Sequence, residues 1–421
     1  MSARLLPVRP DLTQLKHQAK DLLRALHNSE PKAVSEMKEH FQSAIKPSKA
    51  KLADAQFILA RSYGAASWAR LTQSCRLIDA IWTDDADTVR KLVLTHPYLL
   101  HENAGIGNRN WGPPLTYAAN LGRDGIIHLL RDLGADDLRS AFNRAALQGQ
   151  IDTARALHAM QGNPSLPLDA LVGPACTLNV PGTALAFELG AVVHDANGRC
   201  IAPINVVLEN DGRHPYAKHQ ILEMYAAHGA ALPDTPPLAL HRGRLDLLQE
   251  HLRRDPRLLD RRFTHEEIYP PELGCHDEIL ANHGTPLAGT TLLHMCVDYD
   301  EIEIARWLLE HGMNVDARAA VDADGFGGHT ALFASVVSQP NYWMNRRRAE
   351  PAAPFTQLLL DHGADPNVRA SLRKQLHPEY GPDGLREYRD VTALSWGKRF
   401  HRQIFVNATA VQLIAAHGGL E

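Results

Sequence analysis

Residues 289–316 read GTTLLHMCVDYDEIEIARWLLEHGMNVD and contain the clearest structural pattern in the chain. Its apolar residues recur at helical spacing in two short runs, because Leu292, Leu293 and Cys296 share one face and Ile302, Ala305, Leu308 and Leu309 share another. Gly312 then follows where a helix commonly ends in a left-handed residue, a conformation that costs glycine least. The stretch therefore predicts two short antiparallel helices closed by a glycine.

The opening Gly-Thr-Thr-Leu-Leu-His resembles the Thr-Pro-Leu-His motif of ankyrin repeats, which have a period of about 33 residues. The same frame of a small-residue opening, a leucine pair and a terminal glycine recurs along the chain, most clearly in residues 114–136, 330–365 and 392–418. A generic helical protein with chance glycines is the alternative, but the ordered set in at least four units argues against it. We therefore predict an all-α ankyrin-repeat solenoid of about nine units over residues 76–421, with hairpin-like projecting fingers.

The spacing of the terminal glycines separates lean units from units that carry insertions. Gly134, Gly162 and Gly190 follow one another at intervals of 28 residues, whereas Gly312 and Gly363 are 51 apart. The extra residues fall in four segments, namely 262–288, 316–329, 338–354 and 367–391. Three of these are expected to be long fingers, and 338–354 is expected between the two helices of one unit. Long ordered loops in a compact array are often functional.

Residues 1–75 lack the repeat and form a predicted N-terminal helical cap domain. Asp11 is a plausible N-cap, and Leu12, Leu15, Ala19, Leu22 and Leu23 form an apolar stripe behind it. Residues 52–68 resemble the leader that precedes ankyrin arrays in many soil-bacterial proteins. That family implies a small helical domain of unknown role. We expect it to cover the apolar edge of the first repeat, as solenoids require, and a separate binding role stays open.

Composition narrows the class of partner. The 421 residues carry a net charge of −4, with 44% hydrophobic and 22% charged residues. A dedicated nucleic-acid binder is usually strongly basic, so nucleic acid is disfavoured. The N-terminus has no apolar signal core, no apolar run is long enough for a membrane span, and the five cysteines are scattered. We predict a monomeric cytoplasmic protein that does not bind a membrane.

The ankyrin resemblance implies that fingers and first helices line a concave surface where a protein partner binds. We therefore predict a scaffold or adaptor that holds an unknown protein partner on its C-terminal units. Tyrosine, tryptophan and arginine are enriched at binding hot spots. The insertion 338–354 contains Tyr342, Trp343 and Arg346, which favours protein binding. The alternatives for this insertion are packing onto the neighbouring unit and stacking on nucleic acid. The predicted binding residues are Phe326, His329, Tyr342, Trp343, Arg346, His377 and Tyr380.

An enzyme, or a protein that binds a small ligand or peptide, is the alternative function. Histidines and carboxylates on neighbouring fingers could form an acid–base pair, and the candidates are His276, Asp277, Asp324 and His329. No HExxH spacing occurs, and residues 322–328 lack the later ligands of an EF-hand loop. The ankyrin resemblance also implies structural roles for His294 and His329. We therefore expect no metal and no cofactor.

Overall fold

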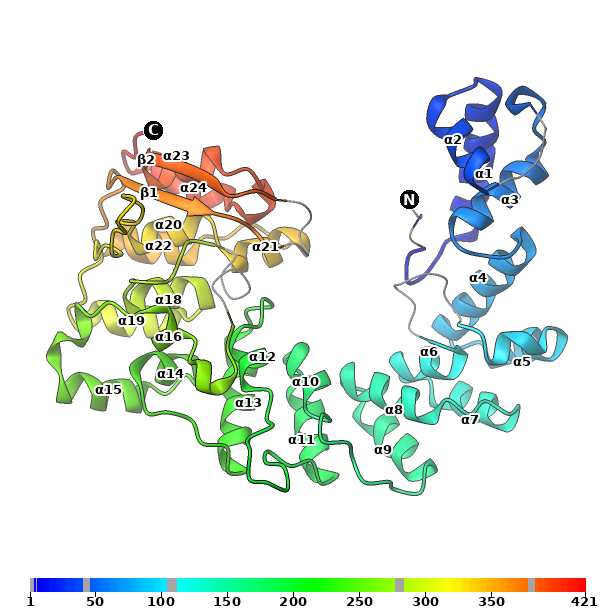
Figure 1. Cartoon of the computed structure of the whole chain (residues 1–421), viewed down its shortest axis with the longest axis horizontal. Helices are drawn as coiled ribbons and strands as arrows, with labels where there is room; N and C mark the ends of the chain where they lie inside the picture. The colour runs from blue at the N-terminus through cyan, green and yellow to red at the C-terminus, as the bar shows by residue number, and fades with distance from the viewer. Residues whose placement is uncertain (1–3, 5, 41–45, 104–111, 277–283, 378–382) are drawn as a thin grey trace. The chain divides into compact units, whose positions relative to one another are not determined.

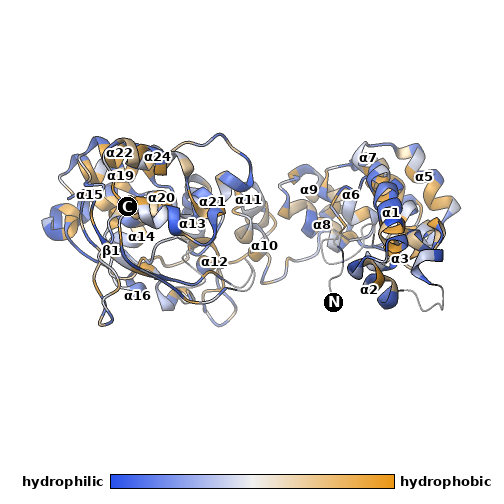
Figure 2. Cartoon of the chain, turned by 90° about the horizontal axis from the view of Figure 1, so that it is seen from above, coloured by the Kyte–Doolittle hydropathy of each residue, from blue (hydrophilic) through white to orange (hydrophobic). Residues whose placement is uncertain are grey.

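The computed structural model describes residues 4, 6–40, 46–103, 112–276, 284–377 and 383–421. The chain divides into two compact units, Met1–Ser165 and Leu166–Glu421. Both consist mainly of short helices (Figure 1). The helices carry hydrophilic and hydrophobic residues side by side (Figure 2), as amphipathic helices of a packed protein do.

The first unit begins with three helices and continues as helix pairs. Asp11 is the predicted cap, because its carboxylate accepts hydrogen bonds from the amides of Thr13 and Gln14. The predicted boundary at residue 75 falls inside α4, so the division into a cap and an array stays a prediction. The helices are α1 (Leu12–His27), α2 (Pro31–His40), α3 (Leu52–Ser62), α4 (Trp68–Trp82), α5 (Ala86–Thr95), α6 (Pro114–Asn120), α7 (Asp124–Asp132), α8 (Leu138–Leu147) and α9 (Ile151–Met160).

The second unit continues the helix pairs. Its helices are α10 (Val172–Cys176), α11 (Val180–Glu188), α12 (Ile204–Leu208), α13 (Pro215–Ala227), α14 (Pro236–His241), α15 (Leu245–Arg254), α16 (His265–Ile268), α18 (Leu292–Tyr299), α19 (Ile302–Glu310), α20 (Ala331–Val336), α21 (Gln339–Arg346), α22 (Pro354–Asp361), α23 (Ala393–Arg399) and α24 (Ala408–Ala416). The first helices α14, α18, α20 and α23 stack in that order (Figure 1). In the described part of the chain, nine successive pairs run from α4/α5 to α23/α24.

The described elements are mostly helical, and one of the predicted hairpin-like fingers contains a small antiparallel sheet that the all-α label leaves out. Strands β1 (Ala370–Lys374) and β2 (Arg386–Val391) pair within the segment 367–391. The residues of β1 alternate between buried and half-buried, which is the period of a strand with one face on the core. A finger this long can pair with itself along several residues, whereas a short finger makes only a tight turn.

Three neighbouring fingers are joined edge to edge by their backbones. We call residues 262–288 the first finger, 316–329 the second and 367–391 the third. Phe263 pairs with Thr290, and the amide of Ala320 donates to the carbonyl oxygen of Gly289 at 2.8 Å. Gly327 then pairs with Ser371 of β1, donating its amide to the Ser371 carbonyl oxygen at 2.6 Å. The described parts of the three predicted long fingers are thus joined in one backbone ladder.

Candidate binding site on the fingers

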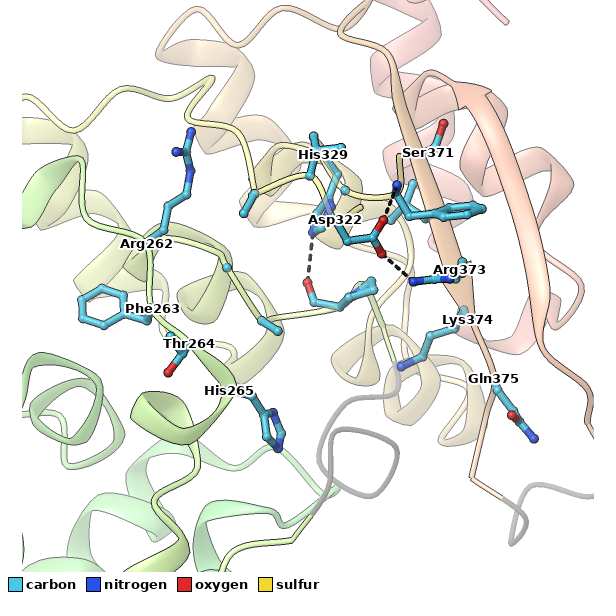
Figure 3. A pocket seen from close by; sticks show the side chains of 18 of the residues that line it. Arg262, Phe263, Thr264, His265, Asp322, His329, Ser371, Arg373, Lys374 and Gln375 are labelled. Atoms are coloured by element: carbon cyan, nitrogen blue, oxygen red, sulfur yellow. Dashed lines mark hydrogen bonds and ion pairs between the residues drawn. The ribbon is translucent and has the colours of Figure 1, made fainter. Parts of the chain in front are cut away.

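The three fingers enclose a pocket of about 780 Å³, which we call the finger pocket (Figure 3). Its lining comes from residues 262–266, Pro286, Ala288 and Gly289 around the first finger, from residues 320–322, Phe326, Gly327 and His329 of the second, and from residues 371–375 with Leu385 of the third. This volume lies within the range of roughly 300–1,000 Å³ that is usual for ligand sites. The backbone ladder between the fingers fixes the position of these walls.

One wall of the finger pocket comes from the start of the first finger. Phe263 is 1% exposed and anchors this wall in the core. The preceding residue, Arg262, is exposed, and its Nε donates to the carbonyl oxygen of Arg318 at 2.7 Å. Thr264 caps the short helix α16, so the half-buried ring of His265 is held at the pocket. The wall therefore offers one exposed cation on a fixed backbone.

The opposite wall is β1, which is braced by charge pairs to the second finger. Arg373 binds Asp322 at 2.5 Å (Figure 3). It also binds Asp324 at 2.8 Å. Two guanidinium groups contact the ring of Phe326, with Arg373 at 4.6 Å and Arg389 at 4.2 Å from its centroid. Such contacts hold the tip of the second finger against the third. They also neutralise the charge of Arg373.

The mouth of the pocket is apolar. Val321 of the second finger and Leu385 of the third are each 61% exposed, and both line the cavity. Single exposed aliphatic residues are ordinary on protein surfaces, but two of them at the rim of a cavity mark a contact surface.

The inner helices are covered by the first finger. All eight residues of α18 and all six of α14 are buried. Helix α16 packs on α14, the hydroxyl of Tyr269 contacts that of Tyr299, and Leu287 is fully buried. A partner therefore cannot reach these first helices without displacing the chain's own segment.

Buried charges lie beneath this covering segment. Arg213 binds Asp298 at 3.0 Å, and their side chains are 1% and 0% exposed. Lys218 binds Glu301 at 2.9 Å, also out of solvent, and burial lowers the pKa of that lysine. These pairs join the α12–α13 turn and α13 to the end of α18. Their depth makes them part of the scaffold rather than of the pocket.

Two predicted binding residues meet the pocket but are themselves buried. Phe326 is 5% exposed and His329 is 1% exposed. The Nε2–H group of His329 donates to the carbonyl oxygen of Pro286 at 3.0 Å (Figure 3). Burial lowers the pKa of His329 to about 3 and that of His294 to about 4, so both rings are neutral near pH 7. His329 therefore holds the first finger to the second.

The predicted residues on the insertion 338–354 lie away from the finger pocket. Tyr342 is buried with its ring 4.7 Å from that of Phe405, and the indole N–H of Trp343 donates to the Asp211 carbonyl oxygen. Arg346 is exposed, and its guanidinium donates to the Tyr342 hydroxyl at 2.8 Å. These contacts pack α21 onto its neighbours, which is the first alternative that the sequence left open.

The three candidate catalytic residues that the structure describes, His276, Asp324 and His329, each have a different partner. His276 contacts Glu209, Asp324 contacts Arg373, and His329 is held by a backbone carbonyl. His377 is half-buried after β1, while Asp277 and Tyr380 lie outside the described residues. Among the described residues, no group of three histidine, cysteine, aspartate or glutamate side chains is placed to hold a metal.

Sequence reasoning identified the fingers but missed the residues that form the open part of the pocket. Arg262, Val321 and Leu385 all fall inside the predicted insertions. A signal for Val321 existed, since a valine beside the glycine-rich run 325–328 is an aliphatic residue on a finger tip. No local pattern indicated that Leu385 and Arg262 share one cavity.

Comparison with known proteins supports the repeat. Residues 288–320 match the family model described as Ankyrin repeat. Among solved structures, the human ASB11 ankyrin repeat domain is similar at 17% sequence identity, with a TM-score of 0.27, over 73% of this chain and 99% of that chain. No curated protein matches the chain. In the described ranges, no helix has the length and apolar character needed to cross a membrane.

Proposed function

We propose that the chain is an ankyrin-repeat protein that binds a protein partner in the finger pocket. Ankyrin repeats generally serve as protein-interaction modules, and the family match covers the unit at the centre of the fingers. The observation that carries the proposal is that three fingers share one open pocket while α14 and α18 are covered. The partner therefore contacts the fingers rather than the inner helices.

We propose that the chain acts as a monomer. The five cysteines in the described residues are free thiols, and free thiols suit a reducing compartment such as the cytoplasm. We place the chain there as a scaffold or adaptor, with residues 1–75 as a cap at the start of the array.

Affinity capture with charge substitutions at the pocket mouth tests the proposal. In the double variant Val321→Asp and Leu385→Asp, two carboxylates replace the exposed aliphatic contacts, so a partner held by the finger pocket is lost. The matched control is Leu168→Asp with Val192→Asp. Those residues are 62% and 48% exposed, lie in the same unit and do not line the pocket.

Circular dichroism first confirms that both double variants fold. We expect the wild type and the control variant to enrich the same partner proteins, and we expect the pocket variant not to enrich them. A partner that binds all three forms equally contradicts a site at the finger pocket. The absence of any partner that distinguishes the wild type from an unrelated bait contradicts the interaction function itself.

A further inference from the structure

The second finger is the shortest of the three, and within the described residues its backbone pairing with β1 does not extend along the whole strand. It has a tight turn at residues 322–325, where the Gly325 amide donates to the Asp322 carbonyl oxygen at 3.1 Å. Its pairing with β1 is confined to Ser371. In the described part of the chain, no bridge joins residues 372–375 to any segment except β2. Among the described residues, the backbone of Arg373 and Gln375 therefore has no strand partner on the pocket side of β1.

The backbone direction at this edge follows from the alternation of a strand. Ser371 exchanges two hydrogen bonds with Gly327, at 2.6 and 3.2 Å, on the side away from β2. Main-chain groups alternate in direction along a strand, so the amide and carbonyl of Arg373 point to the same side as those of Ser371. The stretch from Ser371 to Gln375 spans roughly 13 Å at about 3.3 Å per residue. That length accepts a short extended segment.

The side chains around this edge determine which residue types a bound segment needs. Arg262 forms no ion pair within the described residues, whereas the charge of Arg373 is matched by Asp322 and Asp324. Glu266 also lines the pocket, and hydrogen bonding to its own amide and to the Thr264 hydroxyl lowers the pKa of its carboxyl group. A carboxylate of the ligand therefore complements Arg262. Val321 and Leu385 offer aliphatic contacts beside it.

We propose that the finger pocket takes an extended acidic–aliphatic segment of a partner protein, which adds to β1 as a further strand. The proposal rests on the proposed function and specifies its ligand. Main-chain hydrogen bonds to the open edge supply binding that does not depend on sequence. The carboxylate opposite Arg262 and the aliphatic residues at Val321 and Leu385 supply selectivity.

Selection of a random dodecapeptide phage library on the full chain tests this ligand. We expect enriched peptides with an acidic residue and with aliphatic residues at alternate positions. Fluorescence anisotropy of synthetic copies then measures affinity. Arg262→Glu weakens binding by about tenfold or more, and added salt weakens the wild-type complex. The control Arg348→Glu, an exposed arginine on another surface, leaves affinity unchanged.

Backbone methylation provides the readout that side-chain contacts alone do not produce. In an added strand only every second amide faces β1, so N-methylation at one parity lowers affinity about tenfold or more and the other parity tolerates it. Enrichment of basic peptides, helical spacing of the apolar residues, equal sensitivity at both parities, or no enrichment overturns the proposal. If capture still depends on Val321 and Leu385, only the strand addition fails. If capture does not, the proposed function fails first.

Discussion

At the scale of single residues, Asp300 couples stability to pH. It ends α18 in a left-handed conformation with φ of 63°, and its pKa is raised to about 6, chiefly by burial and then by Glu301. An unfolded aspartate titrates near 3.9. Because the pKa of Asp300 is higher in the folded state, its contribution to the free energy of unfolding is fully present below about pH 3.9. It is lost as the pH rises through about 6.

Asp300→Asn therefore stabilises the protein near neutral pH. The amide carries no charge to bury, and asparagine tolerates the left-handed conformation. We expect the free energy of unfolding in urea to rise by about 1–3 kcal/mol at pH 7 and to change little at pH 4. Asp84→Asn is the matched control, because Asp84 has φ of 60° but is exposed. An equal gain in both variants would assign the effect to the backbone instead.

Gly327 is a residue that the structure does not allow to be replaced by a larger one. Its φ is +122°, and an added Cβ would overlap the carbonyl oxygen of Ala320. Gly327→Ala should cost about 2 kcal/mol or more through backbone strain and displacement of the second finger. Gly363→Ala is the control, since Gly363 has φ of +84° with open space around it. Equal urea midpoints for the two variants would contradict the close contact.

The sequence predicts such residues only in part. A glycine-rich run at 325–328 indicates a tight turn, and a structural histidine at 329 follows from the ankyrin resemblance. Which glycine has no room for a side chain depends on Ala320, seven residues away and across the finger. The sequence predicts Phe326 as a binding residue. Its ring is instead contacted by Arg373 and Arg389 of another finger, which no local pattern indicates.

At the scale of elements, α21 is a packing element. The Asn341 amide donates to the carbonyl oxygens of Ser335 and Val336, and Tyr342 stacks on Phe405. Tyr342→Ala should therefore lower the free energy of unfolding by about 3 kcal/mol through the cavity it leaves, and partner binding should persist. Tyr216→Ala at a 68% exposed site should cost no more than about 0.5 kcal/mol. Lost capture with unchanged stability would restore α21 as a binding surface.

The sequence predicts the helix pairs but not how the first finger packs on them. Helical periodicity and glycine spacing place the pairs, because both are local patterns of a few turns. The path of the first finger across α14 and α18 depends on contacts between distant residues, such as Tyr269 with Tyr299 and His329 with Pro286. No local pattern encodes those contacts. Binding on the predicted concave surface stays a prediction, and the inner helices α14 and α18 of that surface are covered.

At the scale of the whole molecule, the two compact units define how far a local defect should spread. In a repeat array, stability is nearly a sum of terms within units and between neighbours, so cooperativity weakens with distance. Leu130 in the first unit and Leu308 in the second are both fully buried. Replacing either by alanine should cost about 2–5 kcal/mol locally.

Hydrogen exchange of the full chain, read by mass spectrometry, measures that spread. With Leu130→Ala we expect faster amide exchange in Met1–Ser165 and unchanged exchange in Leu166–Glu421, and with Leu308→Ala the reverse. Each variant serves as the control for the other, because the residue type and burial are the same. Faster exchange in both units with either variant would mean that the chain unfolds as one cooperative body. In that case a substitution in the first unit would also weaken the finger pocket.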